Sequence, residues 1–453
     1  MQYRIEGKYG TIAFGKISLF ITPGGLPPLS NIIQVHERPS LAASIPLSLQ
    51  HLFAMFGSTV LVPILFKVDP ATILLMNGIG TLIYLLITKF KIPAYLGSSF
   101  AFLSPVFVVL GSEGGGYSAA LGGFIVVGVI FTLVALLIKL AGTRWIDVVF
   151  PPAAMGAIVA VIGLELVPVA AQMAGLIAKP GAPADWSPDG ATIAVSIVTL
   201  SIGVVGSVLF RGFLKVIPIL IAIVVGYALA SILGLVAVKE AISAAAWFQS
   251  PTFYSPTFDW SSIAIIAPAA LVVIAEHIGH LIVTGNIVEK DLTKDPGLSR
   301  SLLGNGVSTV LSGFVGSTPN TTYGENIGVM AISRVYSVWV IGGAAVIAIV
   351  LSFIGKLSAL IQTIPEAVMG GVSLLLFGVI AASGIRMLVE TKVDYSKPAN
   401  LMLTTVVLVI GLSGAALKFG NFELKGMALA TVSAIVLSLF LKLIEVFRLS
   451  SEE

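Results

Sequence analysis

Six ionisable side chains lie inside long apolar stretches of the sequence, away from the ends of those stretches. They are His51, Glu165, Glu276, His277, His280 and Glu325. An unpaired charge at bilayer depth costs at least about 2.5 to 3.5 kcal/mol, so residues of this kind are candidates for function. Carboxylates accept hydrogen bonds from N–H groups, and histidine exchanges a proton near neutral pH. Carboxylate and histidine side chains in such positions therefore predict a site that binds a polar solute together with a proton.

Spacing separates these residues into a strong candidate pair and weaker single candidates. Glu276 and His280 are four residues apart and share one helix face, so we predict function for them in preference to a structural ion pair. His277 lies about 100° further around the same helix. His51 and His277 could each be a buried core residue with hydrogen-bond partners or a functional residue, and the sequence favours neither interpretation. Glu165 is expected to make contacts between helices, with a coupling role as the alternative.

A polar block from Ser317 to Asn326 interrupts an otherwise apolar segment and contains Glu325. Backbone that leaves the helical conformation at membrane depth must line a cavity inside the protein. A second polar stretch, Tyr95 to Phe102, interrupts another apolar segment. Interrupted segments in corresponding positions of two halves indicate a site near the bilayer midplane, with helix N-termini directed into it. Within the block, Gly324 has no side chain to shield its amide.

The composition defines the class of protein that holds these residues. The chain has 453 residues, of which 57% are hydrophobic and 10% charged, with a mean hydropathy of +1.04. Soluble domains carry about 25% charged residues, so we predict an all-α polytopic membrane protein. The absence of cysteine excludes disulfides and thiolate metal sites. We predict no metal, no cofactor and no nucleic-acid partner.

Apolar runs of near-spanning length predict about fourteen transmembrane segments. They lie near residues 44–66, 70–88, 93–110, 119–141, 150–172, 191–210, 215–237, 264–286, 300–315, 320–335, 336–355, 364–388, 398–417 and 424–447. With a cytoplasmic N-terminal tail at 1–40, 19 of the 25 Lys and Arg side chains fall on the inside and 6 outside. This bias predicts that both termini are cytoplasmic.

The two sets of seven segments resemble each other. Pro151 to Gly156 opens the fifth segment and Pro365 to Gly370 opens the twelfth, and the two share the pattern Pro-x-Ala-x-Met-Gly. An odd number of segments per copy places the copies in opposite orientations, as in the inverted repeats of secondary transporters. Chance recurrence of helix starts made of proline and small residues is the alternative for this match alone.

The predicted site makes specific demands on its solute. Two carboxylates, Glu276 and Glu325, require N–H donors, whereas exposed backbone amides require carbonyl oxygens. A pyrimidine such as uracil offers alternating N–H and C=O groups around one small ring and matches both demands. An anion would be repelled by the two carboxylates unless one were protonated.

Several motifs resemble those of the nucleobase–ascorbate transporter (nucleobase–cation symporter-2) family. The signature region is Glu325 to Arg334, and the resemblance extends through Ser48 to Gly57, Tyr95 to Phe102 and Ala275 to Leu281. It covers roughly residues 38 to 448 and is closest to the bacterial uracil:proton symporters of that family. Ser333 departs from the family pattern, which has threonine there, but keeps the hydroxyl group.

The resemblance implies an architecture and a set of site residues. It implies fourteen segments in two inverted repeats, with short antiparallel strands in segments 3 and 10, and a homodimer in the bacterial cytoplasmic (inner) membrane. The implied core domain comprises 41–149 and 264–360, the implied gate domain comprises 150–263 and 361–448, and a short tail follows at 449–453. The implied roles are ring N–H binding by Glu276 and Glu325, carbonyl binding by the amides of Phe100 and Gly324, lining by Tyr323 and Ser58, and proton coupling by His280 with Glu276.

Three alternatives to proton-coupled uracil uptake remain at this point. The same fold could carry xanthine or another purine, or an anion, as sulfate-permease relatives do. An intramembrane enzyme would use Ser98 or Ser99 as nucleophile and His280 as base. Only the presence of those residue types supports catalysis, so we predict that the chain is not an enzyme.

Overall fold

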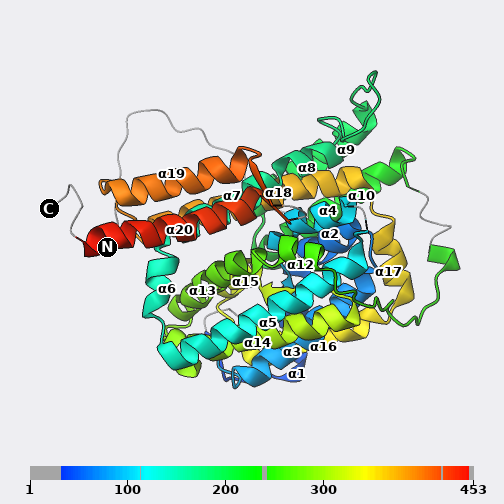
Figure 1. Cartoon of the computed structure of the whole chain (residues 1–453). Helices are drawn as coiled ribbons and strands as arrows, with labels where there is room; N and C mark the ends of the chain where they lie inside the picture. Colours follow the sequence, from blue (N-terminus) through cyan, green and yellow to red (C-terminus); the bar gives the residue numbers. More distant parts are fainter. Residues whose placement is uncertain (1–31, 113, 237–241, 420–421, 448–453) are drawn as a thin grey trace, which may run out of the picture.

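The structure is a computed structural model that describes residues 32–112, 114–236, 242–419 and 422–447. These residues form a bundle of packed helices with two short strand pairs (Figure 1). In chain order the elements are α1 Leu41–Ala54, α2 Phe56–Phe66, α3 Pro70–Ile87, β1 Leu96–Ser98, η1 Phe100–Phe102, α4 Leu103–Gly111, α5 Tyr117–Ala141, α6 Arg144–Val149, α7 Pro152–Glu165, α8 Val167–Met173, α9 Gly190–Leu209, η2 Gly212–Val216, α10 Pro218–Ile232, α12 Trp260–Ile266, α13 Ala269–Ile287, η3 Thr293–Gly297, α14 Leu298–Val315, β2 Asn320–Thr322, α15 Gly324–Ser333, α16 Val338–Ser352, α17 Gly355–Gln362, α18 Glu366–Glu390, α19 Pro398–Leu412, β3 Ala416–Phe419, β4 Phe422–Lys425 and α20 Gly426–Val446.

Within the described residues, seven helical stretches are long and apolar enough to cross a membrane, or eight if the bent pair α1–α2 is one span. The bend between α1 and α2 is 42°. The predicted segments 150–172 and 264–286 are each built from two helices, because the chain leaves regular helix before Pro168 and at Pro268, where proline lacks the N–H that a helix interior requires. The chain is therefore a multi-pass membrane protein, and the count of fourteen segments stays a prediction.

Glycines allow the long helices to pack closely in antiparallel pairs. A Cβ on Gly128 of α5 would lie 2.8 Å from the carbonyl oxygen of Gly306 on α14, and one on Gly163 of α7 would lie 2.3 Å from that of Phe377 on α18. On α3, a Cβ on Gly78 would lie 2.6 Å from a carbonyl oxygen of α16. Small residues at such crossings are the usual means of helix association in membranes.

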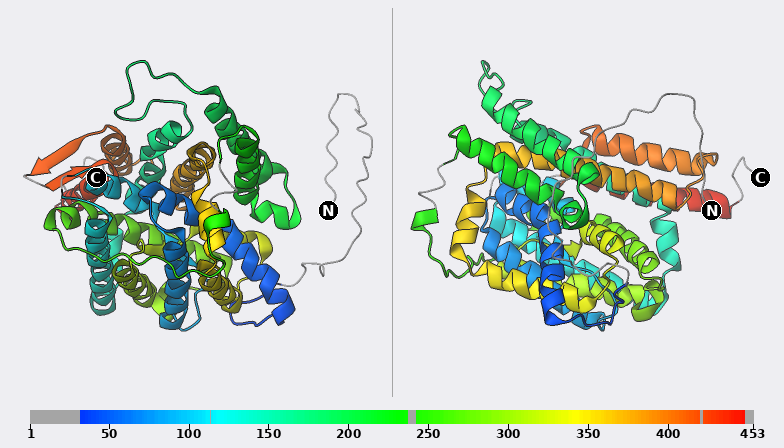
Figure 2. Two further views of the ribbon diagram at one scale, coloured as in Figure 1. Left: turned by 90° about the vertical axis from the view of Figure 1, so that its right-hand side faces the viewer. Right: turned by 180° about the vertical axis from the view of Figure 1, so that it is seen from behind.

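One of the strand pairs lies outside the two segments in which the sequence analysis expects strands. The strands β3 and β4 form an antiparallel hairpin between α19 and α20, at the edge of the bundle (Figure 2). The sequence interpretation treated this stretch as the end of one apolar segment and the start of the next. A chain reversal of this kind depends on local turn geometry, which the apolar pattern does not report.

Only the end of the predicted N-terminal tail lies within the described residues, and it is packed against the bundle. Ile33 and Val335 form a parallel β-bridge, and the Ser337 hydroxyl donates to the Glu37 carbonyl oxygen at 2.6 Å. The guanidinium carbon of Arg38 lies 3.4 Å from the centre of a Trp339 ring. Residues 1–31 and the predicted C-terminal tail, 449–453, lie outside the described residues.

Candidate functional site

The strands β1 and β2 lie within the two polar stretches singled out in the sequence, and they pair with each other. The register is Leu96 with Thr322, Gly97 with Thr321, and Ser98 with Asn320, in antiparallel orientation. The pairing is extended at both ends, because the Tyr323 amide donates to the Tyr95 carbonyl and the Ser99 amide to the Pro319 carbonyl. Non-helical backbone inside the bundle thereby obtains hydrogen-bond partners within the protein.

Side chains from neighbouring helices hold β2 in place. The Asn320 amide nitrogen donates to the Met76 carbonyl oxygen and to the Ser308 hydroxyl, at 2.9 Å in both cases. The Thr309 hydroxyl donates to the Asn320 carbonyl and accepts from its amide, both at 3.2 Å. Much of the polarity of this region therefore serves the interrupted backbone.

Tyr323, which was predicted to line the site, fastens β2 to β1. Its hydroxyl donates to the Ser98 carbonyl oxygen at 3.0 Å, and the residue is only 4% exposed. A Cβ on Gly97 would lie 2.2 Å from the tyrosine ring. Glycine at position 97 is therefore required for the tyrosine to cross the strand.

A helix begins two residues after each strand. Phe100 starts η1, which leads into α4, and Gly324 starts α15. Among the described residues, neither the Phe100 amide nor the Gly324 amide has a hydrogen-bond acceptor. Unpaired amides at helix N-termini carry partial positive charge and favour an oxygen acceptor. The Phe100 ring packs edge-on against Phe377 of α18, with ring centres 6.0 Å apart.

The acidic side chain of Glu325 lies in the first turn of α15. The hydroxyl of Ser58, which is buried on α2, donates to Glu325 Oε1 at 3.0 Å. A carboxylate in the first turn of a helix is stabilised by the helix dipole. Ser58 and Glu325 are 267 residues apart in the chain, so α2 and α15 together define this part of the site.

The helix α13 contributes Glu276 and His280 to the same place. His280 Nδ1 lies 3.2 Å from the Thr322 hydroxyl, and a Cβ on Gly324 would lie 3.2 Å from His280 Nε2. The carboxylates of Glu276 and Glu325 are near enough to interact electrostatically. The described contacts contain no ion pair between Glu276 and His280.

The other ionisable residues have partners that the sequence analysis did not identify. His51 Nδ1 lies 3.0 Å from the amide nitrogen of Asn326, and His277 is hydrogen-bonded on both ring nitrogens. Glu165 of α7 accepts from the Ser104 hydroxyl of α4 at 2.6 Å and from the Met427 amide at the start of α20 at 2.9 Å. The sequence analysis selected these ionisable residues because their surroundings in the sequence are apolar. Apolar surroundings give no information about which other parts of the chain supply the hydrogen-bond partners.

The catalytic alternative has no geometric support. The Ser98 hydroxyl is paired with Thr318 at 2.6 Å, and Ser99 caps its own helix by accepting from the Ala101 amide. Neither serine is hydrogen-bonded to His280 in the part of the chain that the structure describes. The same part contains no group of three or more His, Cys, Asp or Glu side chains placed to hold a metal ion.

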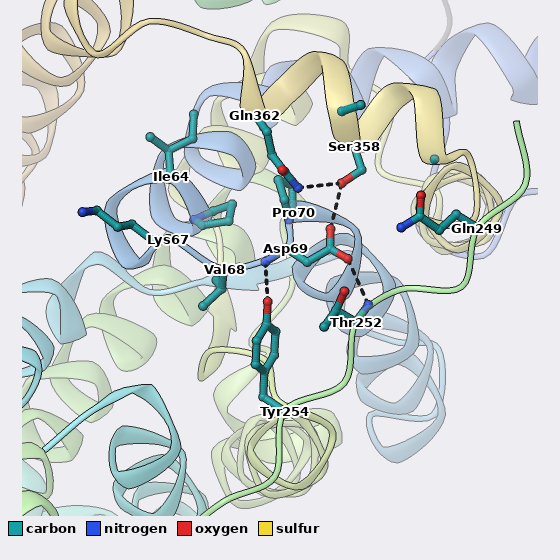
Figure 3. Close-up of a pocket in the computed structure, with 13 residues that line it drawn as sticks. Ile64, Lys67, Val68, Asp69, Pro70, Gln249, Thr252, Tyr254, Ser358 and Gln362 are labelled. Atoms are coloured by element: carbon teal, nitrogen blue, oxygen red, sulfur yellow. Dashed lines mark hydrogen bonds between the residues drawn. The ribbon is translucent and has the colours of Figure 1, made fainter. Parts of the chain in front are cut away.

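A cavity of about 570 Å³ lies beyond the C-terminal end of α2, between the α2–α3 turn and α17 (Figure 3). Asp69 on its wall accepts hydrogen bonds from the Ser358 hydroxyl at 2.7 Å and from the Thr252 amide at 2.9 Å. The Asp69 amide donates to the Tyr254 hydroxyl at 2.9 Å. Asp69 thus fastens the extended segment before α12 to α17 and to the start of α3.

Comparison with known proteins identifies the family. A model described as the permease family matches residues 42–420. The chain belongs to this family. It is 69% identical over 421 residues to the uracil permease of Paenibacillus larvae, covering 93% of this chain and 99% of that protein. It is 66% identical to the uracil permease of Escherichia coli K12, covering 92% of this chain and 95% of that protein. The predicted membership of the nucleobase–ascorbate transporter family is confirmed.

Solved structures with little sequence identity share the fold. The transmembrane domain of the cyanobacterial bicarbonate transporter BicA matches with a TM-score of 0.59 at 14% identity, covering 91% of this chain and 99% of that one. SLC26A9 matches with a TM-score of 0.64 at 11% identity, covering 90% of this chain and 66% of that one. This chain therefore shares its fold with these two proteins.

Proposed function

We propose that this chain is a uracil:proton symporter of the bacterial cytoplasmic membrane, with both termini in the cytoplasm. The observation that carries the proposal is the set of groups gathered around the strand pair. Two unpaired helix-terminal amides, at Phe100 and Gly324, lie just beyond the paired strands, and Gly324 begins the helix that carries Glu325. The names of the relatives with 66–69% identity support uracil as the solute.

The proposed binding mode pairs each polar group of the ring with one group of the protein. The ring N–H groups donate to Glu276 and Glu325, and the ring carbonyls accept from the amides of Phe100 and Gly324. Ser58 donates to Oε1 of Glu325, and a carboxylate has about four acceptor sites, so the carboxylate keeps acceptor sites for the solute.

The charges at the site support proton coupling. Glu276 and Glu325 repel each other when both are ionised, and His280 adjoins the Gly324 backbone. A proton taken up by Glu276 or His280 reduces the negative charge around a neutral ring. Binding of the proton and of the solute then favour each other reciprocally.

The proposed transport cycle moves a core (41–149 and 264–360) against a gate (150–263 and 361–448). In Figure 1, α7, α18, α19 and α20 lie together above α3, α5, α14 and α16, which supports this division. The pairing of α5 with α14 and of α3 with α16 is the pattern that two inverted repeats would produce, since a two-fold axis exchanges these pairs. We further propose that two copies associate through the gate.

Uptake by purified protein in proteoliposomes with an imposed proton gradient tests the proposal. Labelled uracil should accumulate, and excess unlabelled uracil should abolish the signal. Xanthine, cytosine, thymine and sulfate are the competitors. Strong competition by xanthine would indicate a broader nucleobase carrier, and competition by sulfate would indicate an anion carrier.

A further inference from the structure

Two stretches of chain connect the proposed core with the proposed gate at the end of the bundle where α17 lies (Figure 1). The first connector follows α10 and leads to α12, and its described part is 242–259. The second connector, 353–365, runs from the end of α16 through α17 to the start of α18. Relative movement of core and gate at this end of the bundle has to be accommodated along these two connectors.

The two connectors pair with each other through their backbones. Phe248 of the first and Ile354 of the second form an antiparallel β-bridge. The Gln249 amide donates to the Phe353 carbonyl oxygen at 2.9 Å, and a second backbone hydrogen bond, of 3.2 Å, lies on the other side of the bridge. The rings of Phe248 and Phe353 stack with their centres 5.7 Å apart. These contacts join the connectors into one unit.

One side chain in the turn between α2 and α3 binds both connectors. Asp69 Oδ1 accepts from the Ser358 hydroxyl of the second connector at 2.7 Å, and Oδ2 accepts from the Thr252 amide of the first at 2.9 Å. The Asp69 amide donates to the Tyr254 hydroxyl, also of the first connector (Figure 3). Asp69 is only 9% exposed, so its carboxylate depends on these donors in place of water.

The two helices that meet at Asp69 lead to the proposed site. The helix α2 carries Ser58, the partner of Glu325, and α3 provides the Met76 carbonyl oxygen that holds Asn320 of β2. The helix α17 packs against α3 and α16, which both belong to the proposed core. The connectors are therefore fastened to the elements that support the solute.

Contacts with the gate begin a short distance further along the second connector. Ser358 is bound to Asp69 of the proposed core, whereas the Thr363 hydroxyl lies 2.6 Å from the Tyr227 hydroxyl on α10 of the proposed gate. The change from core contact to gate contact therefore falls in the last turn of α17. Hinges in proteins are commonly a few residues at the ends of such elements.

We propose that Asp69 is a positioning residue for transport, which holds the two paired connectors to the core as one unit. The proposal rests on the proposed function, since it concerns a carrier whose core moves against its gate. The connectors then keep their mutual contacts throughout the cycle. The second connector bends between Ser358 and Thr363, where its contacts change from core to gate.

A disulfide across the connector pair tests whether the connectors move together. Opposed residues that exchange no hydrogen bonds in an antiparallel pair have Cα atoms about 4.5 Å apart, a separation that a disulfide can bridge. The chain has no cysteine, so Phe248→Cys combined with Ile354→Cys adds a single pair of thiols. Oxidation, verified by mass spectrometry, should leave uracil uptake by the double variant unchanged, as in each single variant. Uptake that stops on oxidation and returns on reduction would overturn the proposal.

Hydrogen exchange of the purified protein tests the role of Asp69 without transport. Asp69→Ala removes the acceptor shared by the connectors. Asp189→Ala is the matched control, because Asp189 caps α9 through the Thr192 amide at 2.8 Å and is exposed. In Asp69→Ala, peptides from both connectors should exchange at least about tenfold faster than in the wild type, because each connector loses a hydrogen bond to a charged group. In Asp189→Ala, both should exchange as in the wild type.

A comparison of rate with affinity separates positioning from a general loss of structure. Asp69→Ala should lower the maximal rate of uracil uptake by about tenfold and leave the Kd for uracil in detergent unchanged, because Asp69 does not contact the site residues. A loss of affinity equal to the loss of rate would overturn the proposal, as would faster exchange in only one connector or in neither.

The cross-link retains Asp69 and therefore decides the question even if Asp69→Ala does not fold. The predicted exchange pattern in a protein that carries no uracil would support the anchoring of the connectors and contradict the proposed function.

Discussion

At the scale of single residues, the site contains two kinds of polar group. Some already form hydrogen bonds within the protein, and others still have a free donor or acceptor. Glu325 accepts a hydrogen bond from Ser58, and the amides of Phe100 and Gly324 have no acceptor among the described residues. Asn320 and Tyr323, by contrast, use their polar groups on neighbouring backbone. A solute is therefore expected to contact the first set and to leave the second unchanged.

Neutralising either carboxylate should abolish saturable uracil uptake. Glu325→Gln and Glu276→Gln keep the size of the side chain but replace one acceptor oxygen by a donor nitrogen, which cannot accept from a ring N–H. Uptake into proteoliposomes measures the loss, and elution as a monodisperse species shows that the variant is folded. Glu366→Gln is the control, because Glu366 pairs with Lys179 at an exposed position. Normal uptake by either site variant would refute the assignment.

A methyl group at the first residue of α15 should interfere with the site, whereas one further along the helix should not. A Cβ at Gly324 would lie 3.2 Å from His280 Nε2, but one at Gly328 would meet nothing within 4 Å. Gly324→Ala should raise the KM for uracil by about tenfold, the equivalent of one hydrogen bond of roughly 1.4 kcal/mol. Gly328→Ala should transport normally. Equal kinetics in the two variants would exclude a role for the Gly324–His280 contact.

At the scale of elements, the helices can approach closely because particular positions lack a side chain. On α7 and α18 the closest approach involves the backbone itself, since the carbonyl oxygen of Phe377 occupies the space that a Cβ on Gly163 would need. Backbone atoms cannot rotate away as a side chain can. The separation of these two helices is therefore limited at this position, as it is at Gly384, where a Cβ would lie 2.3 Å from the Ala160 amide nitrogen.

Gly163→Ala should lower the stability of the protein, by about 1 to 3 kcal/mol if the cost is that of ordinary overpacking. Gly378→Ala is the matched control on α18, since its Cβ would meet nothing within 4 Å, and helix propensity favours alanine over glycine. Thermal unfolding in detergent, followed by tryptophan fluorescence, measures the difference. A melting temperature for Gly163→Ala that is not below that of Gly378→Ala would contradict the packing argument.

Local sequence patterns predicted part of the site but not its assembly. Polarity inside apolar segments identified Glu276, His280 and Glu325, because a buried charge is costly wherever the chain places it. The same patterns indicated where helices are interrupted. They did not give the register of β1 with β2 or the contact of Ser58 with Glu325, since these join positions more than 200 residues apart. Such contacts depend on how whole helices pack.

At the scale of the whole molecule, one acidic side chain joins two parts that the proposed cycle would move. Glu165 belongs to α7 of the proposed gate and accepts from Ser104, which belongs to α4 of the proposed core. Its other oxygen accepts from the Met427 amide at the start of α20. Relative motion of core and gate would have to break the first contact and could preserve the second.

Cross-linking the proposed core to the proposed gate should stop transport reversibly. The chain contains no cysteine, so the double variant Ser104→Cys with Glu165→Cys introduces the only thiols. Oxidation should block uracil uptake in the double variant, and reduction should restore the level seen before oxidation. Each single variant serves as a control that oxidation leaves unchanged. Full uptake by the oxidised, cross-linked protein would argue against movement at this contact.

Removing the proton gradient should prevent accumulation of uracil. A protonophore added to loaded proteoliposomes is expected to release the accumulated solute, because the solute gradient is then no longer coupled to a driving force. The measurement is the retained label with and without a sodium gradient. Accumulation that survives the protonophore and depends on sodium would identify a different coupling ion.

The pairing of β1 with β2 also has a consequence for the synthesis of the protein. Ser98 and its strand partner Asn320 are 222 residues apart. At ribosomal speeds of about 5 to 20 residues per second, the first strand precedes the second by roughly 10 to 45 s. During that interval the first polar stretch lacks the backbone partner that it has in the finished protein. We therefore expect the insertion machinery, or transient neighbours within the nascent chain, to shelter this stretch from lipid until the second half arrives.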